Sequence, residues 1–157
     1  MEGNQQLLRD FYEAFARKDH ATMATCYRND ATFGDPVFVA LDAEETRAMW
    51  RMFCLGGQDL SVTFSDVKAD EKTGSARWEA RYTFAPTGRS VHNVINASFE
   101  FADGRIAKHR DSFGFYKWTR MALGPVGLLA GWTPMVRNKV RKQAAQQLQR
   151  FVEGESG

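Results

Sequence analysis

The sequence has little of what marks disulfide-rich or membrane-spanning proteins. Two cysteines and four prolines occur in 157 residues, so a disulfide scaffold is excluded, and we expect Cys26 and Cys54 to stay reduced in the cytoplasm. The longest apolar run, residues 121–132, is interrupted by glycines and a proline and is too short to cross a bilayer. The first residues lack a basic segment followed by an apolar one, so we expect no signal peptide. Length and composition together predict one globular domain.

Acidic residues are almost missing from one part of the chain. Residues 105–150 contain ten lysines and arginines but a single acid, Asp111, whereas residues 1–104 contain 11 basic and 16 acidic side chains. A basic third can attract nucleic acid, an anionic lipid surface or an acidic ligand. Such an excess is more often a solvated helix face. We therefore expect no nucleic-acid partner and no contact with a membrane surface.

Aromatic side chains are abundant, with 12 Phe, 4 Trp and 4 Tyr, which indicates a large apolar interior or an aromatic-lined cavity. Helical spacing of apolar residues predicts helices at 5–17 and 21–27, and an Asp42 and Glu45 capping box begins a third that ends near residue 57. Residues 28–30 are expected to form a turn and 31–38 an extended segment. Alternating patterns then predict a meander of strands from 60 to about 118. Helices followed by a meander indicate an α+β fold in which a curved antiparallel sheet wraps the helices.

Two carboxylates are candidates for acid–base chemistry. Asp35 lies between aromatic residues on an extended segment, and Asp111 shares the strand parity of Phe113. Burial raises the pKa of such carboxyl groups, which suits a general acid or base. His109 has the same parity and lies roughly 7 Å along the strand, within reach of Asp111 through one water. The structural alternatives are that Asp35 caps a turn before Pro36 and that Asp111 pairs with a basic side chain.

The order of helices and strands, together with Asp-Ala-Thr-x-x-Asp-Pro-Val at residues 30–37, resembles the nuclear transport factor two-like superfamily. Its members include ketosteroid isomerases, SnoaL-like polyketide cyclases and limonene-epoxide-hydrolase-like enzymes. The resemblance covers residues 5 to about 118. It implies a cone-shaped cavity between the curved sheet and the helices.

The sequence matches some of the catalytic residues of these enzymes and lacks others. Resemblance to ketosteroid isomerases implies that Asp35 is the proton-shuttling base, but the positions of the two oxyanion donors hold Phe11 and Ala97. Tyr12, Tyr27 or Asn93 could replace those donors only by reaching the cavity.

A second match concerns residues 104–113, which are similar to the final strand of the epoxide hydrolases and SnoaL-like proteins. This match implies an acid–base role for Asp111. The hydrolase's arginine and second aspartate would fall at Trp78 and Ala80, and an asparagine that helps hold its water would fall at Asp35. The sequence therefore holds one base position from each chemistry and a complete set from neither.

Two classes of function remain open. One is acid–base catalysis, as in an isomerase, cyclase, dehydratase or epoxide hydrolase, on an apolar small molecule, with Asp35, Asp111 and His109 as catalytic residues. The other is a non-catalytic ligand-binding or oligomerisation module. Aromatic and polar side chains that would line the substrate cavity, or equally fill the core, are Tyr12, Tyr27, Phe33, Trp50, Phe53, Trp78, Tyr82, Asn93, Phe99 and Phe113. The three histidines lack metal-ligand spacing, so we expect no metal and no other cofactor.

The remaining expectations concern assembly and the tail. The sheet's convex face, with Asn96 and Ser98, is mixed enough for a homodimer interface. We assign residues 1–120 to the cone and 121–157 to an apolar, glycine-rich segment and a C-terminal helix of the same domain. Because soluble proteins avoid large exposed apolar patches, we predict that Leu128, Leu129 and Trp132 close the mouth of the cone or seal a subunit contact. The helix from Pro134 should pack outside.

Overall fold

The computed structural model describes residues 2–56 and 59–156, which form helices and strands in the order of an α+β protein. Four helices and strands precede the meander: α1 (Glu2–Ala16), α2 (His20–Thr25), β1 (Tyr27–Gly34) and α3 (Ala43–Gly56). The meander is β2 (Ser61–Ala69), β3 (Thr73–Phe84), β4 (Arg89–Ala102) and β5 (Arg105–Ser112). Three helices follow it: α4 (Phe115–Leu123), α5 (Pro125–Ala130) and α6 (Pro134–Ser156).

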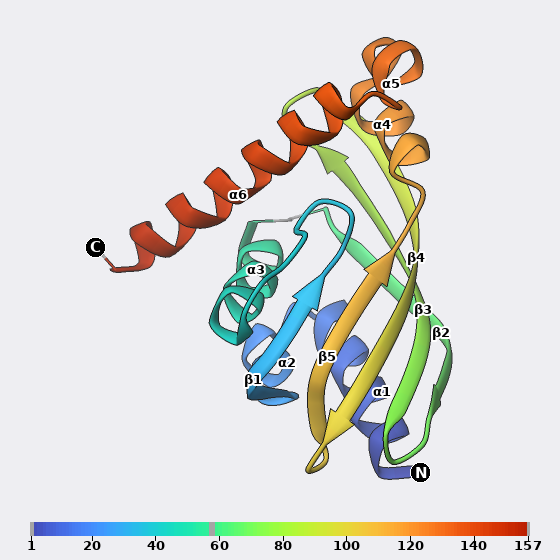
Figure 1. Ribbon diagram of the computed structural model, residues 1–157, viewed down its shortest axis with the longest axis vertical. Helices are drawn as coiled ribbons and strands as arrows, with labels where there is room; N and C mark the ends of the chain where they lie inside the picture. Colours follow the sequence, from blue (N-terminus) through green and yellow to red (C-terminus); the bar gives the residue numbers. More distant parts are fainter. Residues whose placement is uncertain (1, 57–58, 157) are drawn as a thin grey trace.

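The strands form one curved sheet in the order β1-β5-β4-β3-β2. Strands β2 to β5 are antiparallel neighbours, and helices α1 to α3 lie against the concave side (Figure 1). The α+β fold and the curved sheet around the helices confirm the prediction. β1 departs from the antiparallel pattern, because it pairs with β5 in parallel. This edge position agrees with the proline that follows the strand.

Two predicted boundaries are wrong. Residues 28–30 lie inside β1 rather than in a turn, and the pairing register shifts between Tyr27 and Thr32, so the polar residues occupy an irregular stretch of the strand. The last strand ends at Ser112 instead of about residue 118. Gly114 is the N-cap of α4, and its carbonyl accepts a hydrogen bond from Trp118 N at 3.0 Å. The alternating pattern of Asp111, Phe113 and Phe115 therefore continues beyond the end of the strand, and Phe115 is the first residue of α4.

The capping box at the start of α3 is confirmed. Glu45 N donates to Asp42 Oδ1 at 2.8 Å, and Asp42 N donates to Glu45 Oε1 at 3.0 Å. Both orphan amide groups at the start of this helix are thereby satisfied. The helix consequently starts at a fixed residue and carries Trp50 and Phe53 towards the sheet.

The interior between the sheet and the helices is filled with large side chains. Alternate residues of β4 are buried along its inward face, and these pack with the inward faces of α1 and α3. The largest fully buried side chains are Trp50, Tyr12, Tyr27, Phe11, Phe15, Phe33, Leu8, Met23, Met49, Ile95, Ile106 and His109. Both cysteines are buried and unpaired.

For the segment after the sheet, one of the two predicted arrangements is wrong, and the other, a contact between subunits, stays a prediction. Leu128, Leu129 and Trp132 are 55%, 75% and 67% exposed, so they do not close the mouth of the cone. Instead α6 runs back across the open end (Figure 1), where Arg141 Nε donates to Pro36 O at 2.9 Å. Leu148 joins the main core. No helix among the described residues has both the length and the hydropathy needed to cross a membrane.

Candidate functional site

A chain of buried hydrogen bonds crosses the interior from α3 to β5. Trp50 Nε1 donates to Tyr27 Oη at 2.9 Å. Tyr27 Oη lies 2.8 Å from His109 Nδ1, and His109 Nε2 lies 2.8 Å from Asp111 Oδ1. Trp78 Nε1, from β3, approaches the same Asp111 oxygen at 3.4 Å. Four separate elements therefore hold one histidine and one carboxylate in fixed positions.

One arrangement of hydrogens satisfies every donor in this chain. Burial raises the pKa of Tyr27 well above its ordinary value, so the hydroxyl keeps its hydrogen. That hydrogen needs an acceptor, and the group that lies beside it is His109 Nδ1, so the hydroxyl donates to this nitrogen. A neutral His109 then carries its hydrogen on Nε2 and donates it to Asp111. The imidazole is thereby oriented on both sides, and Asp111 receives donors from two rings.

The backbone explains why His109 and Asp111 meet. They are two residues apart on β5, so both side chains point to the concave face of the sheet. Ala97 lies directly opposite Asp111 in β4, and Phe99 lies opposite His109. Ala97 is buried, and the phenyl ring of Phe99 packs 4.3 Å from the imidazole ring, centre to centre. The expected bridging water is wrong, because the two side chains bond directly.

Asp35 lies beyond the end of β1, in the loop that α6 contacts. Its Oδ1 accepts from Val37 N at 2.7 Å and Phe38 N at 2.6 Å, so Asp35 does cap the turn around Pro36. Burial nevertheless raises its pKa to about 7, and the nearby charge of Asp111 adds to this rise. The two amide hydrogen bonds and Arg141 oppose it. Asp35 is therefore close enough to Asp111 to sense its charge, and titrates near neutral pH.

Tyr12 supplies an unused donor near Asp111. Its hydroxyl is the only fully buried side-chain polar atom among the described residues that has no hydrogen-bond partner. Burial, and secondarily the charge of Asp111, raise its pKa well above the ordinary value. An unpaired buried hydroxyl costs free energy and is the kind of group that a bound water or ligand satisfies. The Asp111 side chain is itself only 2% exposed, and among the described residues no hydrogen bond reaches its Oδ2.

Tyr82 and Asn93 lie closer to the open end. Tyr82 Oη accepts from Trp118 Nε1 at 2.8 Å, and its pKa is raised by burial and by the charge of Asp35. Asn93 is buried on the inward face of β4, and the described residues offer its side chain no recorded hydrogen bond. Neither residue bonds to the chain formed by Tyr27, His109 and Asp111.

Some of the remaining candidate residues fill the core, and others are only partly buried. The rings of Phe33, Trp50 and Phe99 pack directly on the imidazole of His109, so they form the wall of the buried chain. Phe53 and Phe113 are only partly buried. The narrow part of the cone is thus packed with rings, and the partly exposed candidates lie towards α6.

The sequence did not predict two contacts of this region. The sequence predicts Trp118 at the end of a strand and Arg141 on a helix that packs on the outside of the same domain, but they bond to Tyr82 and to the Pro36 carbonyl. Both belong to the segment after the sheet, more than 30 residues from their partners. No local pattern in the sequence signals such contacts.

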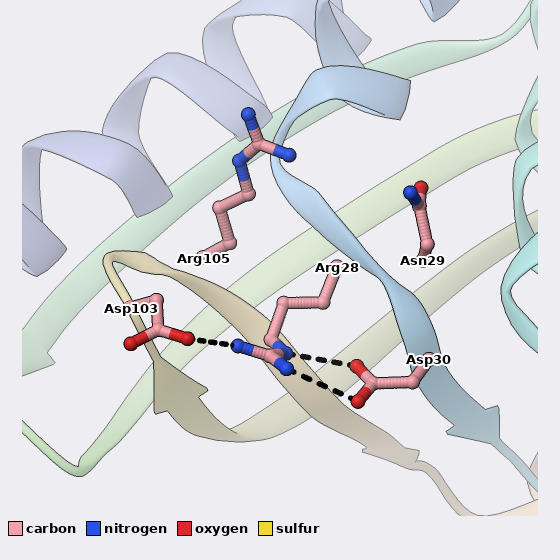
Figure 2. A pocket seen from close by; sticks show the side chains of 5 residues that line it. All are labelled: Arg28, Asn29, Asp30, Asp103 and Arg105. Carbon is pink, nitrogen blue, oxygen red and sulfur yellow. Dashed lines mark hydrogen bonds and ion pairs between the residues drawn. The ribbon is translucent and has the colours of Figure 1, made fainter.

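A polar hollow of about 570 Å³ lies elsewhere, on the outer surface near the turn between β4 and β5. Figure 2 shows Arg28 between the carboxylates of Asp30 and Asp103, to both of which it is bonded. These charges satisfy one another, and both carboxylates are largely exposed. Arg105 also lines the hollow, and Figure 2 marks no bond from its guanidinium to the other lining residues. In the described parts of the chain, no group of three His, Cys, Asp or Glu side chains is arranged to hold a metal ion.

Comparison with solved structures finds the same fold in proteins of low sequence identity. An LEH-like epoxide hydrolase from M. tuberculosis is 22% identical, with 82% of this chain and 96% of that chain covered and a TM-score of 0.65. A candidate polyketide cyclase from Streptomyces antibioticus, IdmH, is 21% identical over 75% and 96% of the two chains, with a TM-score of 0.63. A candidate SnoaL-like polyketide cyclase from Jannaschia sp. CCS1 is 12% identical over 79% and 94%, with a TM-score of 0.68.

No curated protein sequence matches the chain significantly. The model of the SnoaL-like domain matches residues 8–109, which is more than half of the chain and includes every strand except the last residues of β5. The match covers Asp35 and His109 and ends two residues before Asp111. On this match and the cone-shaped fold, the protein belongs to the SnoaL-like domain family.

Proposed function

We propose that the protein is an acid–base catalyst that acts on a small, largely apolar molecule. The observation that carries this proposal is the buried hydrogen-bond chain of Tyr27, His109 and Asp111. A second carboxyl group, Asp35, has a pKa of about 7 because it is buried and because it senses the charge of Asp111. Pairs of titratable groups in unlike environments are the usual arrangement for acid–base roles. The names of the similar structures, polyketide cyclase and epoxide hydrolase, agree with this class of reaction.

In this proposal Asp111 is the base. A hydrogen on His109 Nε2 and one on Trp78 Nε1 point at Oδ1, which leaves Oδ2 to accept a proton from substrate or from a water. Tyr27 and His109 do not touch the substrate. They are positioning residues that fix the carboxylate and stabilise its charge, because a rigid, oriented donor costs no reorganisation during reaction.

Asp35 has the complementary role. With a pKa of about 7, a large fraction of this carboxyl is protonated at neutral pH and can donate a proton to a leaving or carbonyl oxygen. Tyr12 can donate a hydrogen bond to the same oxygen, since its hydroxyl has no other partner. The reaction class is therefore proton removal by Asp111 with oxygen stabilisation by Tyr12 and Asp35, for an enolisable carbonyl compound or an epoxide.

The test uses two apolar probes of those classes. Exchange of the acidic hydrogens of an aryl β-dicarbonyl in D₂O is followed by NMR, and opening of styrene oxide by chromatography. We expect the wild-type protein to accelerate at least one reaction and Asp111→Asn to lower that rate about 10²- to 10⁴-fold. His109→Asn should shift the pH profile as well as the rate, as expected for a positioning residue.

The matched control is Glu100→Gln, which removes a carboxylate from the exposed side of β4. It should leave the rate unchanged. Equal rates for the wild type and Asp111→Asn, with both proteins folded by circular dichroism, would contradict the proposal.

A non-catalytic binding or oligomerisation module is the second candidate, and the ring-filled narrow end of the cone favours it. In that case Tyr12 and Asn93 would hold a ligand without reaction, or the exposed convex face, which includes Asn96 and Ser98, would join two copies. Native mass spectrometry separates these outcomes. A copurified apolar ligand with no turnover of either probe supports a carrier, and a dimer without ligand supports an assembly module.

A further inference from the structure

Apolar side chains are gathered on the outside of α5 and the start of α6. Five residues of this segment are more than half exposed, and we call them the α5 patch: Val126, Leu128, Leu129, Trp132 and Met135. Isolated exposed apolar residues are ordinary, but contiguous ones mark an interaction site. In Figure 1, α5 projects at the end of the molecule farthest from α1. Nothing in the described chain covers this patch.

The patch faces outward because its backbone is packed against α4. A Cβ atom at Gly127 would lie 1.9 Å from Thr119 O, and one at Gly131 would lie 2.1 Å from Thr119 Oγ1. Only glycine permits this close approach. Tyr116 Oη also donates to Leu128 O at 2.8 Å. The glycine side of α5 is therefore fixed against α4, and the leucines on the other side cannot turn inward without losing these contacts.

The helices on either side of α5 in sequence carry exposed cations and no acid close to the patch. Lys117, Arg120, Arg137 and Lys139 are exposed on α4 and α6 beside α5, and the described residues provide none of them with a recorded ion pair. Arg120 and Arg137 lie over the rings of Tyr116 and Phe115. Residues 112–150 contain no aspartate or glutamate. The surface thus combines protruding apolar side chains with charges that are all positive.

We propose that the α5 patch docks on an anionic lipid bilayer. The leucines and Trp132 would enter the headgroup boundary, where an apolar face is buried by about 5–10 Å and tryptophan is favoured. The surrounding cations would lie against lipid phosphates, each contributing attraction near a negative surface. A second copy of the chain is the other possible occupant. It fits less well, because two copies of this patch would bring like charges together without a carboxylate to pair them.

This inference reverses the expectation of a solvated face without membrane contact. That expectation treated the basic part of the chain as a solvated helix face, and Lys139 and Lys142 of α6 are indeed exposed. The sequence also predicted that the apolar residues of α5 are buried. Because they are exposed, a membrane-binding surface is favoured over a merely solvated one. The inference concerns a surface distinct from Asp111 and Asp35, so it holds whether or not the protein is an enzyme.

The test is sedimentation of the full chain with vesicles of phosphatidylcholine alone or of phosphatidylcholine with phosphatidylglycerol. We expect binding to the anionic vesicles to be at least about tenfold tighter than to the neutral ones and to weaken at about 0.5 M salt, where charges are screened. Leu129→Ser/Trp132→Ser should weaken it at least about tenfold. The control Leu55→Ser, which changes an exposed leucine of α3, should bind like the wild type.

A second variant keeps the test decisive if the first one aggregates. Arg137→Gln/Lys139→Gln should retain the fold and reduce both the binding and its salt dependence. Absence of sedimentation with both vesicle types would overturn the proposal, as would unchanged binding of Leu129→Ser/Trp132→Ser. If light scattering instead shows a dimer that this double variant disperses, the patch is a contact between copies and the lipid proposal is wrong.

Discussion

Trp50 and Trp132 are the same side chain in two opposite surroundings. Trp50 is 2% exposed, contacts the rings of Phe11, Phe33 and His109, and donates its indole hydrogen to Tyr27. Trp132 is 67% exposed, and its indole hydrogen reaches only the carbonyl of Leu129 in its own turn at 3.2 Å. Both regions are rich in apolar residues, but only the first is surrounded on all sides by the sheet and helices.

The difference shows that apolar composition does not by itself indicate burial. Around Trp50, apolar residues recur at the period of the helix or strand that carries them, so each one faces the core. Around Trp132, glycines occupy the positions that face α4, and the leucines between them point the other way. A short helix that packs through glycine exposes its larger side chains.

The largest contrast should be in stability. Trp50→Ala leaves a cavity and removes a hydrogen bond to Tyr27, so we expect the free energy of unfolding to fall by about 3–5 kcal/mol. Trp132→Ala should change it by no more than about 0.5 kcal/mol. Urea unfolding of both variants measures the two values. A loss of several kcal/mol from Trp132→Ala would mean that the α5 patch is packed in solution, and would remove the contrast between the regions.

A smaller effect should follow from the titration of Asp35. Its pKa is about 7 in the folded protein and about 3.9 in an unfolded chain. Between these values the folded state binds more protons, so the free energy of unfolding should fall as the pH rises from about 4 to about 7, and level off above that. At about 1.4 kcal/mol per pKa unit the loss is at most about 4 kcal/mol.

Asp35→Asn is the control for this pH dependence. The amide oxygen can still accept from Val37 N and Phe38 N, so the turn is kept, but the group no longer titrates. The wild type should therefore lose stability relative to the variant as the pH rises over this interval. Parallel curves would show that Asp35 titrates like a solvated carboxyl group.

The smallest effect concerns the contact between α6 and the Pro36 loop. Arg141→Gln removes the charged hydrogen bond to Pro36 O and should cost about 1 kcal/mol of stability. It also removes the positive charge that lowers the pKa of Asp35, so that pKa should rise further, which NMR titration of the carboxyl carbons would detect. Lys142→Gln, which changes the next, exposed cation of the same helix, should alter neither value. A Lys142→Gln shift as large as that of Arg141→Gln would indicate a general charge effect.

Much of the fold could be predicted because its signals are local. The capping box of α3 and the alternating pattern of β3 and β4 depend on neighbours in sequence, and both are confirmed. The end of β5 could not be predicted, since Phe113 and Phe115 continue the alternation while Gly114 begins a helix. The position of α6 was also missed, because it depends on contacts such as the one between Arg141 and Pro36, far apart in sequence.

The sequence predicted which residues belong to the candidate site better than it predicted the hydrogen bonds between them. Parity placed His109 and Asp111 on one face, and the structure adds their direct bond. The sequence predicts Tyr27 as a possible donor to a ligand, but it bonds to His109, because the pairing of β1 with β5 brings the two strands side by side. No turn in the sequence specifies this parallel pairing. The catalytic role of Asp35 and Asp111 stays a prediction.

The hydrogen bond between Arg141 and Pro36 has a consequence for the order in which the molecule is completed. During synthesis, all five strands leave the ribosome before α6 does, and domains fold as their residues emerge. The sheet and α1 to α3 can therefore assemble while the loop around Asp35 is still uncovered. α6 is added last and joins residues 105 positions apart, a closure that is slow relative to local contacts. For that interval the nascent protein has its buried hydrogen-bond chain in place, while the loop around Asp35 still faces solvent.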